Sequence, residues 1–194
     1  MEDPARTYDA SERMTSFKTP LNRTTSYTYG AASTTIAFPA GQQTQHNYSA
    51  GLIVSEVDPA GFSTAYTYDA QRNVLTSTDE RGAVSTYTYD SKGNVLTARN
   101  PLNQTWTLTY NAANDVASVA NPMGQTTTAT YDAQGNLTQI TDPLGRAGVR
   151  LTYDGLGQPL TRLDALNRTT SLQWNASGNL THLTLSRSCA TART

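Results

Sequence analysis

The sequence repeats itself about every 21 residues, and this period limits the possible fold more than any other feature. In each copy an aromatic residue is followed by a small residue that favours turns. The nine copies are Tyr8-Asp9, Tyr29-Gly30, Tyr48-Ser49, Tyr68-Asp69, Tyr89-Asp90, Tyr110-Asn111, Tyr131-Asp132, Tyr153-Asp154 and Trp174-Asn175. A period this regular predicts a tandem array in which each repeat packs against its neighbours in the sequence.

Two turns are predicted in each repeat from the fourth copy onward. Each has Asp or Asn first and Gly or Asn fourth, often with Pro second, which fits a type I turn followed by a left-handed residue. The predicted turn-forming residues are Asp58, Gly61, Asp90, Gly93, Asp132, Gly135, Asp142, Pro143, Gly145, Asp154, Gly157 and Gly178. After Asp69 the fourth residue is Arg72, so we expect that turn to be wider or to be displaced onto Asn73.

The segments between these turns are short. Six or seven residues remain between successive turns, which suits one β-strand and is too short for a helix. Thr is the commonest residue, with 33 copies, and it favours strands over helices. The spacing therefore predicts an all-β fold, an antiparallel meander in a single sheet with about two strands per repeat.

Aromatic residues are expected to share one face of this sheet. Tyr66 and Tyr68 lie two residues apart, as do Leu172 and Trp174, and residues two apart in a strand point to the same side. Equivalent aromatics on every second strand would recur about every 10 Å. The predicted structural ladder is Tyr68, Tyr89, Tyr110, Tyr131, Tyr153 and Trp174.

Composition argues against a large core and against charged partners. Leu, Ile, Val and Phe supply 31 of 194 residues, too few for an ordinary globular interior. The net charge of -1 offers no basic surface for nucleic acid. Neither a signal peptide nor a membrane-spanning run is expected in this chain. The single cysteine, Cys189, cannot form an internal disulfide.

No residue combination indicates catalysis, a metal or a cofactor. Asp132 with Asp142 could be imagined as a glycosidase pair, but every repeat offers an equivalent pair, which a unique active site would not. His46 and His182 have no Cys, His or Ser partner at a motif spacing, so we expect both at the surface. We therefore expect a protein that is not an enzyme.

Several strings resemble the YD repeat of the RHS family. They are Tyr131-Asp132 to Thr138, Thr141-Asp142 to Arg146, Tyr89-Asp90 to Asn94, and Trp174-Asn175 to Thr181. The resemblance implies a curved β-sheet ribbon that is part of a spiral shell enclosing a C-terminal toxin, as in bacterial RHS effectors and ABC toxin components. Teneurins are similar in their extracellular barrel. The self-cleaving core segment and the variable toxin domain of that family are not found in these residues.

Three segments and two functions are expected. Degenerate repeats occupy 1–57, regular repeats 58–185, and a tail without the repeat 186–194. The resemblance implies a structural shell segment whose partners are the remainder of the shell and its enclosed toxin, secreted or at the cell surface as part of a larger exported protein. The alternative is a carbohydrate-binding or adhesion module, because exposed aromatics can stack on sugar rings. Glycans would then be the partners.

Overall fold

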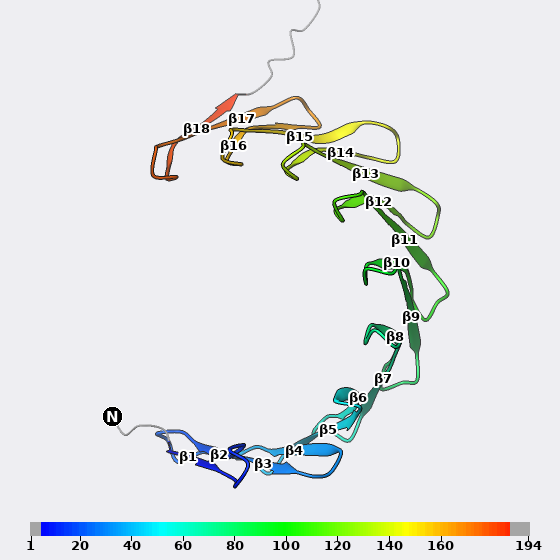
Figure 1. Ribbon diagram of the computed structural model, residues 1–194, viewed down its shortest axis with the longest axis vertical. Coiled ribbons are helices and arrows are strands. Elements are labelled where there is room, and N and C mark those ends of the chain that lie inside the picture. Colours follow the sequence, from blue (N-terminus) through cyan, green and yellow to red (C-terminus); the bar gives the residue numbers. More distant parts are fainter. Residues whose placement is uncertain (1–4, 187–194) are drawn as a thin grey trace, which may run out of the picture. The chain divides into compact units, whose positions relative to one another are not determined.

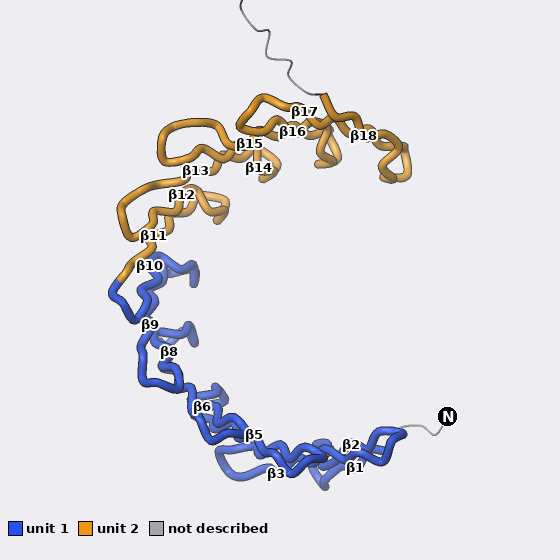
Figure 2. Tube along the Cα trace, turned by 180° about the vertical axis from the view of Figure 1, so that it is seen from behind, with its two compact units in different colours: residues 1–103 blue, residues 104–194 orange. Residues whose placement is uncertain are grey.

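The structure, a computed structural model, describes residues 5–186. This part of the chain contains only β-strands and the turns between them, and no helix in it could cross a membrane. Figure 1 labels these strands, and Figure 2 colours the two compact units into which the chain divides, residues 1–103 and 104–194. Cys189 and nearly all of the predicted tail lie outside the described residues.

The first unit is an antiparallel meander of ten strands. Every strand pairs with the next one along the chain, so each connection is a hairpin. The strands are β1 (Ala5–Tyr8), β2 (Met14–Lys18), β3 (Thr24–Tyr29), β4 (Ser33–Ala37), β5 (Gln43–Ser49), β6 (Leu52–Val57), β7 (Ser63–Tyr68), β8 (Val74–Thr78), β9 (Val84–Tyr89) and β10 (Val95–Arg99).

The second unit continues the same pattern with eight strands, again paired in sequence order. They are β11 (Thr105–Tyr110), β12 (Val116–Ala120), β13 (Thr126–Tyr131), β14 (Leu137–Thr141), β15 (Ala147–Tyr153), β16 (Pro159–Asp164), β17 (Thr169–Trp174) and β18 (Leu180–Ser186). The predicted all-β antiparallel meander with about two strands per repeat is therefore confirmed.

The sheet has no hydrophobic core. None of the residues from 5 to 186 is buried, and the strand residues are half-exposed or exposed. Strand pairs instead contact only their immediate neighbours along the meander. Stability must therefore come from local junctions between adjacent strands.

Five residues separate the last paired residues in nearly every hairpin. Tyr68 pairs with Val74 across residues 69–73, and Val57 pairs with Ser63 across residues 58–62. The turn at Asp69 obeys the same rule, because Arg72 adopts φ 72° and its amide donates to the Asp69 carbonyl at 3.1 Å. The predicted widening or displacement of this turn is thus wrong: the backbone bonds of the turn outweigh the strain of a left-handed arginine.

Two shortened turns break this rule, and both lie in the first unit. Tyr29 pairs with Thr34 across four residues, Gly30–Ser33. Ser49 pairs with Leu52 across only two, Ala50 and Gly51, which have φ 49° and 76°. We call Gly30–Ser33 and Ala50–Gly51 the shortened turns. They coincide with the two copies in which the usual Asp or Asn after the aromatic is replaced by Gly or Ser.

Candidate functional site: the turn and aromatic framework

Most five-residue turns are organised by the carboxylate or amide of the Asp or Asn that opens them, and the turns that open with Thr19 and Phe38 are the exceptions. Asp132 Oδ1 accepts the backbone N–H groups of Gln134 at 3.0 Å and Asn136 at 2.8 Å. Its other oxygen, Oδ2, accepts the side-chain amide of Asn136 at 3.0 Å. Gly135 has φ 85°, a conformation that costs glycine little. One short side chain thereby accepts two backbone amides of the turn, while the Gly135 amide donates to the Asp132 backbone carbonyl at 3.1 Å.

The other predicted turn openers make the same contacts. Oδ1 of each accepts two backbone amides, two and four residues ahead, as at Asp58, Asp90, Asp142 and Asp154. The predicted glycines Gly61, Gly93, Gly145, Gly157 and Gly178 all have positive φ. Pro143 is the second residue of the Asp142 turn, where its fixed φ suits a type I turn.

These hydrogen bonds favour the ionised carboxylate. At Asp132 the side-chain amide of Asn136, followed by its backbone amide, holds the pKa below the ordinary value of 3.8. At Asp142 the Arg146 side chain is the largest cause of a lowered pKa, and the two groups lie 2.6 Å apart. Both carboxylates are partly exposed to solvent, so water weakens this effect.

The aromatic residues bond across the strand junctions through their polar tips. In the second unit, the Tyr131 hydroxyl donates to the Val116 carbonyl at 2.9 Å and the Tyr153 hydroxyl to Leu137 at 2.8 Å. Trp174 does the same with its indole N–H, which donates to Pro159 at 2.8 Å. In each case the acceptor lies 15 or 16 residues upstream.

The first unit repeats this bond with the same spacing. Tyr68 donates to Ile53 at 2.6 Å and Tyr89 to Val74 at 2.7 Å. Burial is the largest cause of a raised pKa for the Tyr89 phenol, and the protonated phenol is the donor in this bond. Tyr110 occupies the equivalent strand end and pairs with Val116.

A β-bulge explains why these carbonyls are available. Tyr68 pairs with Val74 and Thr67 with Thr76, so Leu75 is the extra residue. The ladder from β8 to β9 begins only at Thr76, which leaves the Val74 carbonyl outside it. The Tyr89 hydroxyl supplies the missing donor. The bulge and the following aromatic residue therefore form one structural motif, which is repeated along the chain.

The sequence analysis did not find this bond, although the signal for it is present. After the turn that follows each aromatic of the ladder from Tyr68 to Tyr153, an aliphatic residue or proline starts the next strand. The next aromatic lies 15 or 16 residues beyond that residue. Only the register of the bulge shows that the two meet.

Hydroxyl pairs occupy the opposite side of the strands. The residue before each ladder tyrosine pairs its hydroxyl with one across the hairpin, as Thr88 does with Thr97 at 2.6 Å and Thr109 with Ser118 at 2.6 Å. Successive strand residues point to opposite faces. The sheet in each of the two compact units therefore has an aromatic face and a threonine-rich face.

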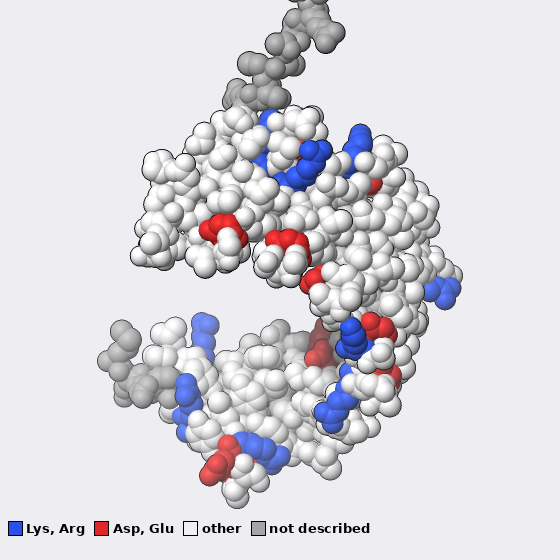
Figure 3. Space-filling view, turned by 45° about the horizontal axis from the view of Figure 1, so that its top comes forward, with Lys and Arg blue, Asp and Glu red and all other residues white. Residues whose placement is uncertain are grey.

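The described residues contain no cluster of His, Cys, Asp or Glu suited to a metal. The turns at Asp132 and Asp142 lie at opposite ends of β14, on the order of 17 Å apart for five strand residues, too far for a glycosidase pair. His46 lies 3.8 Å from Glu56, a partner that the sequence did not indicate, and is half-exposed, while His182 is exposed. Acidic and basic side chains form no continuous patch on the face drawn in Figure 3.

Comparison with known proteins places this framework in a family. The RHS Repeat family matches residues 46–84, 73–105, 110–147 and 153–187, more than half of the chain. The chain therefore belongs to the RHS repeat family. No curated protein matches it in sequence.

Solved structures share the fold. The crystal structure of TcdB2-TccC3-TEV superposes with a TM-score of 0.80 at 17% identity, over 97% of this chain and 11% of that one. The crystal structure of TcdB2-TccC3 gives 0.67 at 14% identity, over 95% and 14%. The Tc holotoxin pore of Photorhabdus luminescens, with a mutated TccC3, gives 0.56 at 15%, over 96% and 13%. This chain thus spans about an eighth of the length of these proteins.

Proposed function

We propose that this chain is a wall segment of an RHS-type shell that encloses a toxin or effector domain and has no catalysis of its own. One observation carries the proposal. A sheet of many strands with no buried residue among 5–186 bonds each repeat to the next through its Tyr or Trp tips. Such an arrangement extends a surface and builds no internal site.

The proposed partners are the remainder of the shell and its enclosed domain. The solved structures that share the fold are toxin components, and this chain matches a small part of each. A wall element of this kind would leave the cell as part of a larger exported protein. Its exposed strand edges, β1 and β18, are the places where further wall would pair.

A chimeric shell tests the proposal. Residues 5–186 would replace the structurally equivalent segment of the TcdB2-TccC3 shell, and protection of the enclosed C-terminal region from an added protease would be measured. We expect the chimera to protect this region as the parent shell does. A control shell in which the same segment is deleted should expose it. The proposal is overturned if an assembled chimera, verified by electron microscopy, loses protection as the deletion does.

A further inference from the structure

Within the described part of the first unit, the aromatic framework is incomplete at Tyr48. The acceptor expected for Tyr48 is the carbonyl 15 residues upstream, at Ser33, and in the structure that carbonyl accepts the Gly30 amide at 2.8 Å. The Tyr48 hydroxyl has no partner within the described residues, whereas Tyr29 and Tyr68 on either side both donate to carbonyls. The shortened turn at Gly30–Ser33 is the cause.

A depression lies at this position. It has a volume of about 370 Å³, within the range of small-ligand sites, and is lined by the two shortened turns together with Arg13, Tyr29 and Tyr48. Regular turns are longer and most open with Asp or Asn, while the residues here are mainly Gly and Ala. Tyr29 and Tyr48 both line the depression and are partly exposed to solvent.

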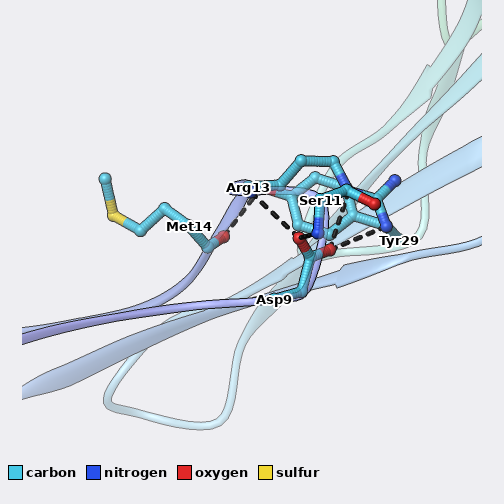
Figure 4. A network of polar contacts seen from close by, with 5 residues as sticks. All are labelled: Asp9, Ser11, Arg13, Met14 and Tyr29. Atoms are coloured by element: carbon cyan, nitrogen blue, oxygen red, sulfur yellow. Dashed lines mark hydrogen bonds and ion pairs between the residues drawn. The ribbon is translucent and has the colours of Figure 1, made fainter.

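One wall of the depression is a fixed guanidinium group. Arg13 lies over the Tyr29 ring, with Cζ 4.3 Å from the ring centroid, and bonds Asp9 Oδ2 through both Nε and Nη2 at 2.7 Å (Figure 4). The Tyr29 hydroxyl in turn donates to Met14. Five N–H donors belong to a guanidinium, so several remain for a ligand. Because Asp9 neutralises the arginine, the wall donates hydrogen bonds without attracting an anion strongly.

We infer that the depression between the shortened turns binds one ring of a neutral sugar, with Tyr48 and Arg13 as its hydrogen-bonding groups. A sugar hydroxyl would pair with the Tyr48 hydroxyl, which can donate and accept, and a second would accept from Arg13. The C–H face of the ring would pack on tyrosine. An acidic sugar would compete with Asp9 for the arginine and place two carboxylates close together. This inference is independent of the shell proposal.

Titration of the intact chain followed by amide NMR tests the site. The probes are glucose, galactose, mannose and N-acetylglucosamine, with glucuronate as the anionic comparison. At least one neutral sugar should produce saturable shifts at Gly30, Ala32 and Gly51, with an affinity on the order of millimolar.

The variant Tyr48→Phe should weaken that affinity roughly five- to tenfold. Since the Tyr48 hydroxyl has no partner among residues 5–186, this variant should keep the fold, and its amide spectrum checks that directly. Tyr27→Phe, on the same strand as Tyr29 but outside the depression, should bind as the parent does. The inference is overturned if no neutral sugar saturates, if only glucuronate binds, or if Tyr48→Phe binds unchanged.

Discussion

The turn after Tyr131 and the turn after Tyr29 both reverse the chain, but they use different backbone bonds. At Asp132–Asn136 the Asp side chain satisfies the turn and the downstream Leu137 carbonyl stays free for Tyr153. At Gly30–Ser33 no acid is present, so the backbone closes on itself and uses the carbonyl that would have received Tyr48. The comparison teaches that the bulge after the turn, present at Leu137 and absent after Tyr29, is what leaves a carbonyl free for the next aromatic residue.

The largest effect should follow from blocking the left-handed residue of a regular turn. Gly135 has φ 85°, which a β-branched residue adopts only with strain. Gly135→Val should lower the free energy of unfolding by about 2 kcal/mol in urea titrations. Gln134→Val, at the preceding exposed position, is the control and should change it little. Equal losses from both variants would show that the turn is indifferent to its backbone geometry.

Removing one tyrosine hydroxyl should lower stability in a regular repeat and leave it unchanged in the repeat that follows a shortened turn. Tyr131→Phe breaks the 2.9 Å bond to Val116 and leaves that carbonyl unpaired, for a loss of about 1 kcal/mol. Tyr48→Phe removes a hydroxyl with no partner in the described structure and should leave stability unchanged. Urea unfolding of the two variants side by side measures the difference. Equal losses in the free energy of unfolding for Tyr131→Phe and Tyr48→Phe would contradict the distinction between the two kinds of repeat.

A stabilising change is expected at Arg72. This residue occupies the left-handed position of a regular turn with φ 72°, where most repeats have glycine. Arg72→Gly should raise the free energy of unfolding by roughly 0.5–1 kcal/mol, because relief of strain exceeds the added entropy of the unfolded chain. Asn114→Gly is the matched control with a smaller gain, since asparagine tolerates this conformation. A lower stability for Arg72→Gly would contradict the strain argument.

The smallest effect concerns pH. The pKa of Asp132 is below 3.8 in the folded chain, so its contribution is present above the unfolded value and is lost as pH falls through the folded one. Asp132→Asn, which mimics the natural Asn111 and Asn121 turns, should be less stable than the parent at pH 7. The difference should narrow below about pH 4, measured by urea unfolding at pH 7, 5 and 3.

The reverse change supplies the control for pH. Asn121 opens a turn with its amide, which donates to the Gln125 side chain at 2.8 Å, and nothing in that pair titrates. Asn121→Asp should therefore introduce a loss of stability in acid that the parent lacks at this turn. A difference between parent and Asp132→Asn that stays constant from pH 7 to pH 3 would refute the role of the carboxylate.

The sequence predicted the local features and missed those that depend on register. Hairpins at Asp58, Asp90 and Asp132 could be predicted because the chemistry of each turn lies within five residues. The bond from Tyr89 to Val74 could not, because it depends on a bulge that only strand pairing defines. Arg72 was misjudged since residue preference at one position is weaker than the two backbone bonds that close the turn.

Domain boundaries stay a prediction. The expected change from degenerate to regular repeats at 57/58 follows the loss of the Asp or Asn after Tyr29 and Tyr48, and the compact units divide elsewhere, at 103/104. The depression could not be predicted from the sequence. The sequence shows that Gly30 replaces the usual Asp or Asn, but it does not show that the Ser33 carbonyl then accepts the Gly30 amide.

The absence of any buried residue among 5–186 has an evolutionary consequence. Since each junction involves only a strand, its bulge and the following aromatic, a gene could gain or lose one complete copy and leave every remaining junction chemically the same. Length can then drift by whole copies, and single positions such as Gly30 can diverge without disturbing distant ones. Proteins with a shared interior lack this freedom, because an inserted segment must be accommodated by every side chain that surrounds it.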